Sequence, residues 1–243
     1  MPVIVFASSK GGSGKTTAAT LLATVLAEKG AGVVVIDADP NRNVADWAKL
    51  PGAPPSLSVV SDVTDENIVD QIEAASTRAA FVIVDLEGSA NLLVGHAVSL
   101  ADFVVVTTKG SQLDAKQAGR TIKLVRDYER TLRRPIPFAV LLTMTSAAIQ
   151  PRTQRHIEQT FVARNIPVLQ TRMVDREAYR AMFSFGGTLR TLDAKNVSNI
   201  EAAIANAHEL AGEIVTRLRE LQAAVALQRG AEAPRPALRV VEG

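Results

Sequence analysis

The chain has 243 residues, of which 47% are hydrophobic and 21% are charged, and its formal net charge is +2. This length can bury one full core, no run of 18 apolar residues predicts a membrane span, and the small net charge does not by itself indicate a nucleic-acid binder. The absence of cysteine excludes disulfides, thiolate zinc sites and cysteine-ligated iron–sulfur clusters. The three histidines, at positions 96, 156 and 208, lie too far apart in the sequence for a local metal motif.

Short apolar runs rich in β-branched residues alternate along the chain with segments of helical pattern. The runs are Val3–Ala7, Val33–Ile36, Phe81–Val84, Phe103–Val106, Phe138–Leu142 and Pro167–Leu169. Strands that are apolar throughout are expected when helices cover both faces of a parallel sheet. We therefore predict a single α/β domain with a mostly parallel sheet covered by helices on both faces.

The first predicted strand is followed by the stretch SSKGGSGKTT, which has the composition of a phosphate-binding loop. Such a loop needs glycines so that backbone N–H groups can approach phosphate oxygens, and a lysine and a hydroxyl for the phosphates and Mg²⁺. Gly14, Lys15 and Thr16 occupy these positions, after a strand and before a helical pattern. A purely structural glycine turn is the less favoured alternative.

The predicted helix after this loop carries an apolar stripe at Leu21, Leu22, Val25 and Leu26. Gly30 follows the stripe, at the position where a left-handed residue often ends a helix. A P-loop NTPase fold requires this strand, loop and helix in direct succession.

The loop departs from the usual phosphate-binding pattern at one place. The usual pattern has a glycine five residues before Gly14, whereas this chain has Ser9 there, followed by a second lysine, Lys10. The stretch KGGSGKTT therefore resembles the deviant loop of the ParA/MinD family of ATPases.

Further stretches resemble the same family in the expected order. VVVIDADP resembles its first switch, with Asp39 placed 24 residues after Lys15, and FVIVDLEG resembles its Mg²⁺-side strand, ending in Asp85. GTL at Gly187–Leu189 is similar to a late family element. The resemblance covers roughly residues 1–220 and is strongest to small ParF-type partition ATPases and VirC-type ATPases of T-DNA transfer.

The resemblance implies a role for each residue of the site. Lys10 would reach across an ATP-bound homodimer to the phosphates of the partner, so that ATP binding and dimerisation become a single event. Lys15 would bind the β- and γ-phosphates, Thr16 would ligate Mg²⁺, Asp39 would position the attacking water, and Asp85 would hold the Mg²⁺ shell through water. The residues implied to contact ATP or ADP are Lys10, Gly11, Gly12, Ser13, Gly14, Lys15, Thr16 and Thr17.

Two neighbouring carboxylates receive other interpretations. Asp37 is interpreted as a strand-end residue, and Glu87 as a solvated loop residue. The chain departs from the family at Leu86–Gly88, where many relatives have Thr-Pro-Pro.

The segment Pro151–Lys195 has eight basic residues against four acidic ones. Such an excess can hold a DNA duplex through its phosphates without reading bases. The candidate DNA contacts are Arg152, Arg155, Arg180 and Arg190. A solvated face or local ion pairing is an equally good interpretation, and a second basic stripe at Lys116, Arg120, Lys123 and Arg130 is interpreted as solvated helix surface.

The last predicted element is one long helix from about Asn199 to Gln228, which would close a domain of residues 1–228. Its candidate inward positions are Ile200, Ile204, Leu210, Ile214, Leu218 and Leu221. The remaining residues, 229–243, contain two prolines and little periodicity, which favours a disordered tail.

Taken with the resemblance, these features imply a slow, Mg²⁺-dependent ATPase for partition of plasmid or chromosomal DNA. Its ATP-bound homodimer would bind DNA non-specifically, and a ParB-like or other adaptor that stimulates hydrolysis would release it. No leader and no DNA-reading helix-turn-helix precede Val3, and the chain does not end in the basic amphipathic helix of a membrane-bound relative. We therefore expect a cytoplasmic, nucleoid-associated protein that does not bind membrane. The alternative is a conjugation or T-DNA transfer accessory, or an ATPase that positions a protein cargo.

Overall fold

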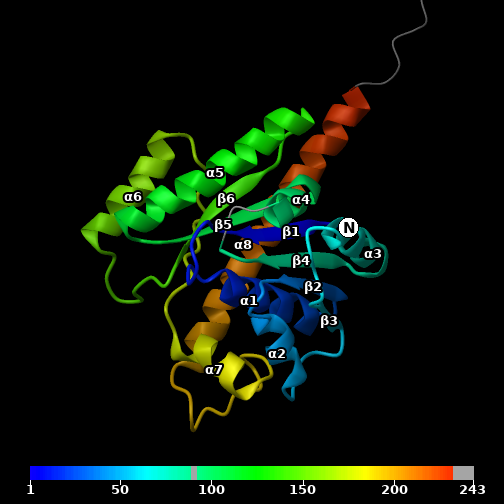
Figure 1. Cartoon of the computed structure of the whole chain (residues 1–243). Coiled ribbons are helices and arrows are strands. Elements are labelled where there is room, and N and C mark those ends of the chain that lie inside the picture. Colours follow the sequence, from blue (N-terminus) through cyan, green and yellow to red (C-terminus); the bar gives the residue numbers. More distant parts are fainter. Residues whose placement is uncertain (89–91, 232–243) are drawn as a thin grey trace, which may run out of the picture.

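The computed structural model describes residues 1–88 and 92–231, which form a six-stranded sheet and the helices that cover it. In chain order the elements are β1 (Val3–Ala7), α1 (Lys15–Glu28), β2 (Val33–Ala38), α2 (Asn43–Lys49), β3 (Leu57–Val60), α3 (Ile68–Arg78), β4 (Phe81–Leu86), α4 (Leu92–Leu100), β5 (Phe103–Lys109), α5 (Gln112–Leu132), β6 (Phe138–Thr143), α6 (Arg152–Ala163), α7 (Glu177–Phe185) and α8 (Ile200–Ala231). The strands lie in the order β3-β2-β4-β1-β5-β6, and all pairs are parallel (Figure 1).

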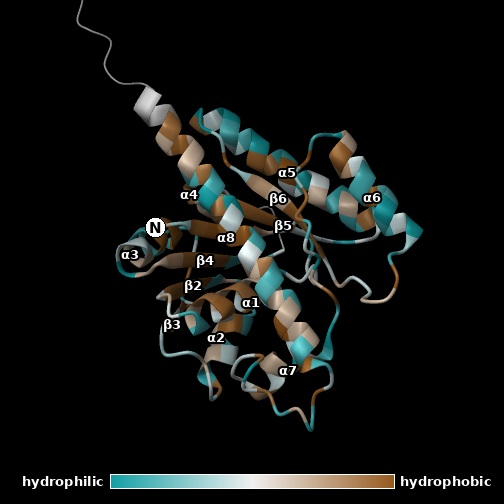
Figure 2. Ribbon diagram, turned by 180° about the vertical axis from the view of Figure 1, so that it is seen from behind, coloured by the Kyte–Doolittle hydropathy of each residue, from teal (hydrophilic) through white to brown (hydrophobic). Residues whose placement is uncertain are grey.

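Each strand contributes alternate residues to two cores, one on each face of the sheet. In β1, Ile4 and Phe6 pack in the core under α1 and α8, whereas Val3, Val5 and Ala7 pack in the core under α3, α4 and α5. Figure 2 shows the hydrophobic strands between the helices, with α8 running across the face that α1 also covers. Two buried faces explain why the strands are apolar throughout, and the predicted fold class is confirmed.

The central position of β1 determines where the site lies. β1 pairs with β4 on one side and with β5 on the other, so the loop after β1 emerges between the ends of its two neighbours. In the register, Asp85 of β4 lies opposite both Phe6 of β1 and Asp37 of β2. The carboxyl ends of parallel strands therefore place the loop and both carboxylates at one edge of the sheet.

Two strand predictions differ from the structure. Pro167–Leu169 is not a strand of the sheet, because only Val168 forms an isolated bridge with Val140 and the chain then turns away. The structure adds β3, which the sequence did not predict. β3 is a four-residue edge strand that pairs with β2 alone and is buried only at Leu57, so its apolar signal is short and weak.

The sequence predicted where the helices α1 and α8 end, and both ends lie close to the predicted positions. α1 ends at Glu28, and Gly30 has a φ of 85° and donates its N–H to the carbonyl of Ala27. α8 extends three residues beyond the predicted end, and the rest of the predicted tail, 232–243, lies outside the described residues. Of its predicted inward positions, Leu210, Ile214 and Leu218 are buried, and Ile200, Ile204 and Leu221 are partly buried against the same core.

Among the described helices, none combines the length and apolar character that crossing a bilayer requires.

Candidate functional site

The loop between β1 and α1 leaves the start of a helix open to an anion. Gly12 and Gly14 have φ values of 68° and 83°, a region that favours glycine. Gly14 is the residue before α1, and no side chain caps the helix and no acidic residue lies in its first turn. The first N–H groups of a helix have no intrahelical partner and carry partial positive charge, so this start can bind phosphate oxygens.

Two threonines brace the loop from neighbouring strands. Thr143, the last residue of β6, donates its hydroxyl to the carbonyl of Ser13 at 2.7 Å, and the Ser13 hydroxyl lies 2.8 Å from that of Thr107 in β5. A Cβ on Gly14 would lie 2.9 Å from the methyl of Met173, so the packing also requires glycine there. Sequence reasoning missed both threonines, although a threonine at the end of an apolar strand next to a glycine loop is a usable signal.

Lys15 is a buried cation surrounded by carboxylates. Its residue is only 5% exposed, and burial lowers its pKa, while Asp85, Asp39 and Glu87 act in the opposite direction. Glu87, interpreted from sequence as solvated, is half-buried and close enough to influence this pKa. The carboxylates of Asp39, Asp85 and Glu87, which lie far from Lys15 in the sequence, therefore surround its ammonium group in the structure.

Asp85 is completely buried, and neither of its carboxylate oxygens has a hydrogen-bond partner among the described residues. Burial, followed by the charges of Asp37 and Asp39, raises its pKa to about 7, against the lowering effects of Lys15 and of the Thr16 hydroxyl, which lies near the carboxylate without hydrogen-bond geometry. A buried carboxylate without a partner calls for a proton or a cation.

The donor set around Asp85 fits Mg²⁺ bound together with phosphates. Mg²⁺ is commonly held by one or two protein oxygens and completes its shell with water and substrate phosphates. Asp85 and Thr16 supply such oxygens at the start of α1. Within residues 1–88 and 92–231, no group of three or more His, Asp or Glu residues could hold a metal without help from a ligand.

Asp37 and Asp39 are adjacent acidic residues with different surroundings. Asp37 is buried, and one of its oxygens accepts the N–H of Ala45 at 2.9 Å in the first turn of α2. Burial is the main cause that raises its pKa. Asp39 lies one residue past β2, and one of its oxygens accepts both the N–H and the side-chain amide of Asn41. Asp37 therefore anchors α2, whereas Asp39 sits in the turn that faces Lys15.

Lys10 is paired within its own chain. Its ammonium lies 2.6 Å from Asp114 in the first turn of α5, and the other oxygen of Asp114 accepts the hydroxyl of Ser111 at 2.5 Å. Burial of Asp114 raises its pKa, but the hydrogen bonds from Lys10 and Ser111 outweigh burial, so the pKa lies below its usual value. The Lys10 side chain is 49% exposed. Sequence reasoning missed Asp114, whose only local signal is the helix-capping spacing from Ser111.

The segment after β4 packs directly on the loop. A Cβ on Gly88 would lie 2.5 Å from the backbone nitrogen of Gly11 and 2.8 Å from the carbonyl carbon of Lys10, so only glycine fits there. This contact links the end of the Asp85 strand to the backbone that carries Lys10.

Gly187, in the late GTL stretch, has a structural contact. It accepts a hydrogen bond of 3.0 Å from the indole nitrogen of Trp47, which is buried in α2. The loop after α7 is thereby fastened to the helix that follows Asp39.

The candidate DNA contacts do not form one cluster. Arg152 and Arg155 are exposed on α6, which packs against α5, and neither is ion-paired to any described residue. Arg180 pairs with Asp175 and Glu177 on α7, which packs against α2 and α8 (Figure 1). Arg190 pairs with Glu28 at 3.3 Å. The four arginines thus lie in two regions, and in one of these regions both arginines are ion-paired.

Comparisons with known proteins were made for the whole chain. The family model described as VirC1 protein matches residues 1–225. The protein ParA of Rhizobium radiobacter is 40% identical over 220 residues, which cover 90% of this chain and 99% of that protein. The protein VirC1 of the same organism is 27% identical over 187 residues, covering 75% of this chain and 80% of that protein. A solved structure of a putative plasmid partition protein from Borrelia burgdorferi, bound to AMPPNP, is 16% identical with a TM-score of 0.66 and covers 89% of this chain and 99% of that one.

Proposed function

Because this chain belongs to the VirC1 family and is related to ParA over nearly its whole length, we propose that it is an ATPase that dimerises with ATP and serves DNA partition. The observation that carries the proposal is the convergence of Lys15, Thr16 and the unpartnered carboxylate of Asp85 at the uncapped start of α1. The triphosphate group of ATP would supply the anion that the start of α1 and Lys15 can bind. The Borrelia protein, which shares the fold, was solved with an ATP analogue.

The residues of the site divide the work of hydrolysis. The backbone N–H groups from Gly11 to Thr17 and the Lys15 ammonium bind the phosphates and hold the γ-phosphoryl group in place. Asp85 and Thr16 would hold Mg²⁺, which would supply positive charge to neutralise the phosphates. Asp39, fixed by Asn41, orients the attacking water towards the γ-phosphorus, and its position next to Lys15 supports this role.

The surface around the site supports a homodimer in which Lys10 acts across the interface. Large apolar side chains are exposed on segments that follow β4, β5 and β6, at the same edge of the sheet as the loop. They are Leu92 (58% exposed), Leu113 (76%), Met144 (44%) and Ile149 (72%). Burying them against a second copy would be favourable, and Lys10 would then exchange Asp114 for the phosphates of the partner.

The test distinguishes the proposed role of Lys15 in ATP binding from that of Lys10 in dimerisation. Lys15→Ala removes the buried cation that binds the phosphates, so ATP affinity in isothermal titration calorimetry should fall at least about 100-fold. Lys10→Ala is the matched control, because its ammonium is half exposed and paired with Asp114. It should keep ATP binding and lose ATP-dependent dimerisation in light scattering. Undiminished ATP affinity of Lys15→Ala would contradict the site.

We further propose that the ATP-bound dimer binds DNA without sequence preference and that an adaptor protein stimulates hydrolysis to release it, which would associate the cytoplasmic protein with the nucleoid. The relation to ParA supports this choice. The match to the VirC1 family favours a second candidate, an accessory ATPase of T-DNA transfer or cargo positioning. Absence of any ATP-dependent affinity for arbitrary duplex DNA at low salt would favour the second candidate.

A further inference from the structure

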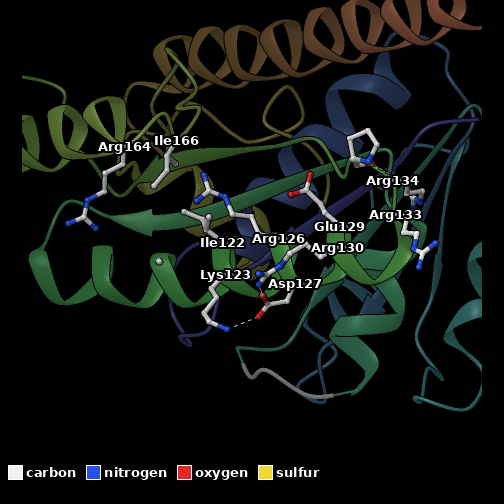
Figure 3. Close-up of a pocket in the computed structure, with 12 residues that line it drawn as sticks. Ile122, Lys123, Arg126, Asp127, Glu129, Arg130, Arg133, Arg134, Arg164 and Ile166 are labelled. Carbon is white, nitrogen blue, oxygen red and sulfur yellow. Dashed lines mark hydrogen bonds and ion pairs between the residues drawn. The ribbon is translucent and has the colours of Figure 1, made fainter.

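A groove of about 770 Å³ lies along the C-terminal half of α5 and is also lined by Pro135, before β6, and by Arg164 and Ile166, after α6. Ile122 and Ile166 contribute apolar walls, and the rim carries long basic side chains (Figure 3). The charged residues that line it are Lys123, Arg126, Arg130, Arg133, Arg134, Arg164, Asp127 and Glu129.

The groove concentrates the positive charge of the chain. Six basic and two acidic residues line it, which gives a local charge of +4, whereas the whole chain carries +2. The rest of the chain therefore sums to −2. A positive concavity on a molecule that is otherwise slightly negative favours an anionic partner at this place.

Four of the six basic side chains have no carboxylate partner among the described residues, and three of these four also make no hydrogen bond to a backbone carbonyl. Asp127 binds Lys123 at 2.7 Å and also Arg130, and Arg134 donates to the backbone carbonyl of Ser99. The carboxylate of Glu129 accepts the N–H of Ile136. That leaves three exposed arginines in the groove that have neither an ion pair nor a hydrogen bond to any residue in the described part of the chain: Arg126, Arg133 and Arg164.

The three unpaired arginines are spread along the groove rather than gathered at one point. Figure 3 shows Arg164 near one end, Arg133 near the other and Arg126 between them. The guanidinium of Arg126 lies 5.9 Å from the ring centre of Phe138, a contact that supports its stem. From Lys123 to Arg133 the helix rises about 15 Å, which equals about four phosphates of one DNA strand.

We infer that this groove is the main surface that binds the phosphate backbone of DNA in the ATP-bound state. The inference rests on the proposed DNA binding and deepens it, because it moves the contact from the arginines predicted on α6 and α7 to α5. Five of the six cations are arginines, whose planar guanidinium fits two phosphate oxygens at once. Unpaired guanidinium groups that are spaced along a groove match the regular row of phosphates in DNA. They match the irregularly placed carboxylates of an acidic protein less well.

The groove also stays open when the nucleotide edge of the sheet is covered. Asp114, which holds Lys10, is in the first turn of α5, and Arg126 lies about 18 Å further along the same helix. A dimer formed over the phosphate loops would leave both grooves exposed. Two grooves in one particle would raise the affinity for a duplex over that of a monomer, which makes DNA binding depend on ATP.

The experiment compares two triple variants that remove the same charge. The groove variant is Arg126→Gln/Arg133→Gln/Arg164→Gln, and the control is Arg155→Gln/Arg180→Gln/Arg190→Gln, drawn from the arginines predicted on α6, on α7 and after it. Binding to a fluorescent 30-base-pair duplex of arbitrary sequence is measured by anisotropy with ATP or ADP over a range of salt. Light scattering with ATP checks that both variants still dimerise.

We expect the groove variant to lose at least about tenfold in affinity for DNA and the control to remain within about threefold of the wild type. Six lost contacts per dimer should also reduce the magnitude of the slope of log K against log salt by about 5. Arg133→Gln/Arg164→Gln, which spares the Arg126 contact with Phe138, is the second variant if the triple one is unstable, and it should lose affinity in the same direction.

Three outcomes would overturn the inference, and they are distinguishable. If wild type with ATP does not bind the duplex, the proposed DNA function fails as well. If wild type binds DNA but the groove variant binds equally well, or the control loses as much, only the groove assignment fails. If poly-L-glutamate binds wild type in a groove-dependent manner and DNA does not, the partner is an acidic protein.

Discussion

At the scale of single residues, the buried carboxylate of Asp85 is the least satisfied group of the site. It has no hydrogen-bond partner among the described residues, and burial raises its pKa to about 7. An unfolded chain would ionise this carboxyl near pH 4. The folded state therefore binds the proton more tightly, and this group lowers stability progressively as the pH rises from about 4 to about 7.

Asp85→Asn should therefore stabilise the protein in the absence of nucleotide and Mg²⁺. A pKa displacement of this size corresponds to on the order of a few kcal/mol, or roughly 5–10 °C in melting temperature for a chain of this length. Thermal unfolding followed by circular dichroism should show this difference at pH 8, and the two curves should converge as the pH falls towards 4. The same variant should no longer be stabilised by Mg²⁺ added together with ATP. Identical melting of variant and wild type at pH 8 would contradict a buried, unpaired carboxylate.

The sequence predicted the site residues that belong to local motifs and missed those that depend on distant contacts. Lys10, Lys15 and Thr16 lie within one ten-residue stretch, whose pattern can be read directly. Asp114 lies 104 positions from Lys10, and no local pattern indicates that α5 brings its carboxylate to that lysine. The pairing is a result of tertiary packing, so only the structure reveals it.

At the scale of elements, the ends of β5 and β6 support the phosphate loop. The hydroxyl of Thr143 donates to the carbonyl of Ser13 and also lies 3.2 Å from the carbonyl of Thr108. One side chain therefore joins the loop to two strand ends. The rigidity of the loop depends on β6, although β6 contributes no residue to the predicted nucleotide contacts.

Thr143→Val should weaken nucleotide binding by about fivefold, because it keeps the shape of the side chain but removes a buried hydrogen bond worth about 1 kcal/mol and thereby loosens the loop. The matched control is Thr145→Val, two residues further on, whose hydroxyl contacts the carbonyl of Met173 at 3.4 Å and not the loop. Titration calorimetry with ATP should show the loss for Thr143→Val alone. Equal affinities of the two variants would argue against bracing by β6.

The elements themselves were largely predictable, with exceptions that have physical causes. The five strands buried on both faces have continuous apolar runs, and these were predicted. The edge strand β3 is half exposed and has a weaker signal, whereas Pro167–Leu169 is apolar but makes only one bridge to the sheet. Apolar content thus predicted the five strands that are buried on both faces, but at Pro167–Leu169, where only Leu169 is buried, it predicted a strand that does not form.

At the scale of the whole molecule, the parallel sheet gathers the phosphate loop, Asp39, Asp85 and the exposed apolar side chains at one edge. The proposed dimer would cover that edge, and its lifetime would be set by hydrolysis. Arg126, in the groove, lies about 18 Å along α5 from Asp114, which is at that edge. In this proposal, the surface that forms the dimer, whose lifetime depends on ATP hydrolysis, is therefore separate from the groove that binds DNA.

Asp39→Ala should trap the proposed dimer. Without the carboxylate that orients water, ATP would remain bound and uncleaved, so dimers should persist in size-exclusion chromatography with ATP for far longer than those of the wild type. Asn41→Ala offers a graded comparison, because it removes only the side-chain amide that contacts Asp39. Rapid return of Asp39→Ala to monomer, with undiminished phosphate release, would remove Asp39 from catalysis.

The contact between Trp47 and Gly187 allows the turn at Asp39 to be followed by tryptophan fluorescence. Trp47 is the single tryptophan of the chain, it is 1% exposed, and its indole is hydrogen-bonded inside a helix that begins four residues after Asp39. All tryptophan emission therefore originates from one buried indole, in the helix that follows the turn of Asp39. If the proposed ATP cycle rearranges that turn, α2 should shift and the wavelength or intensity of the Trp47 emission should change, so the intrinsic fluorescence of the unlabelled protein would report that rearrangement.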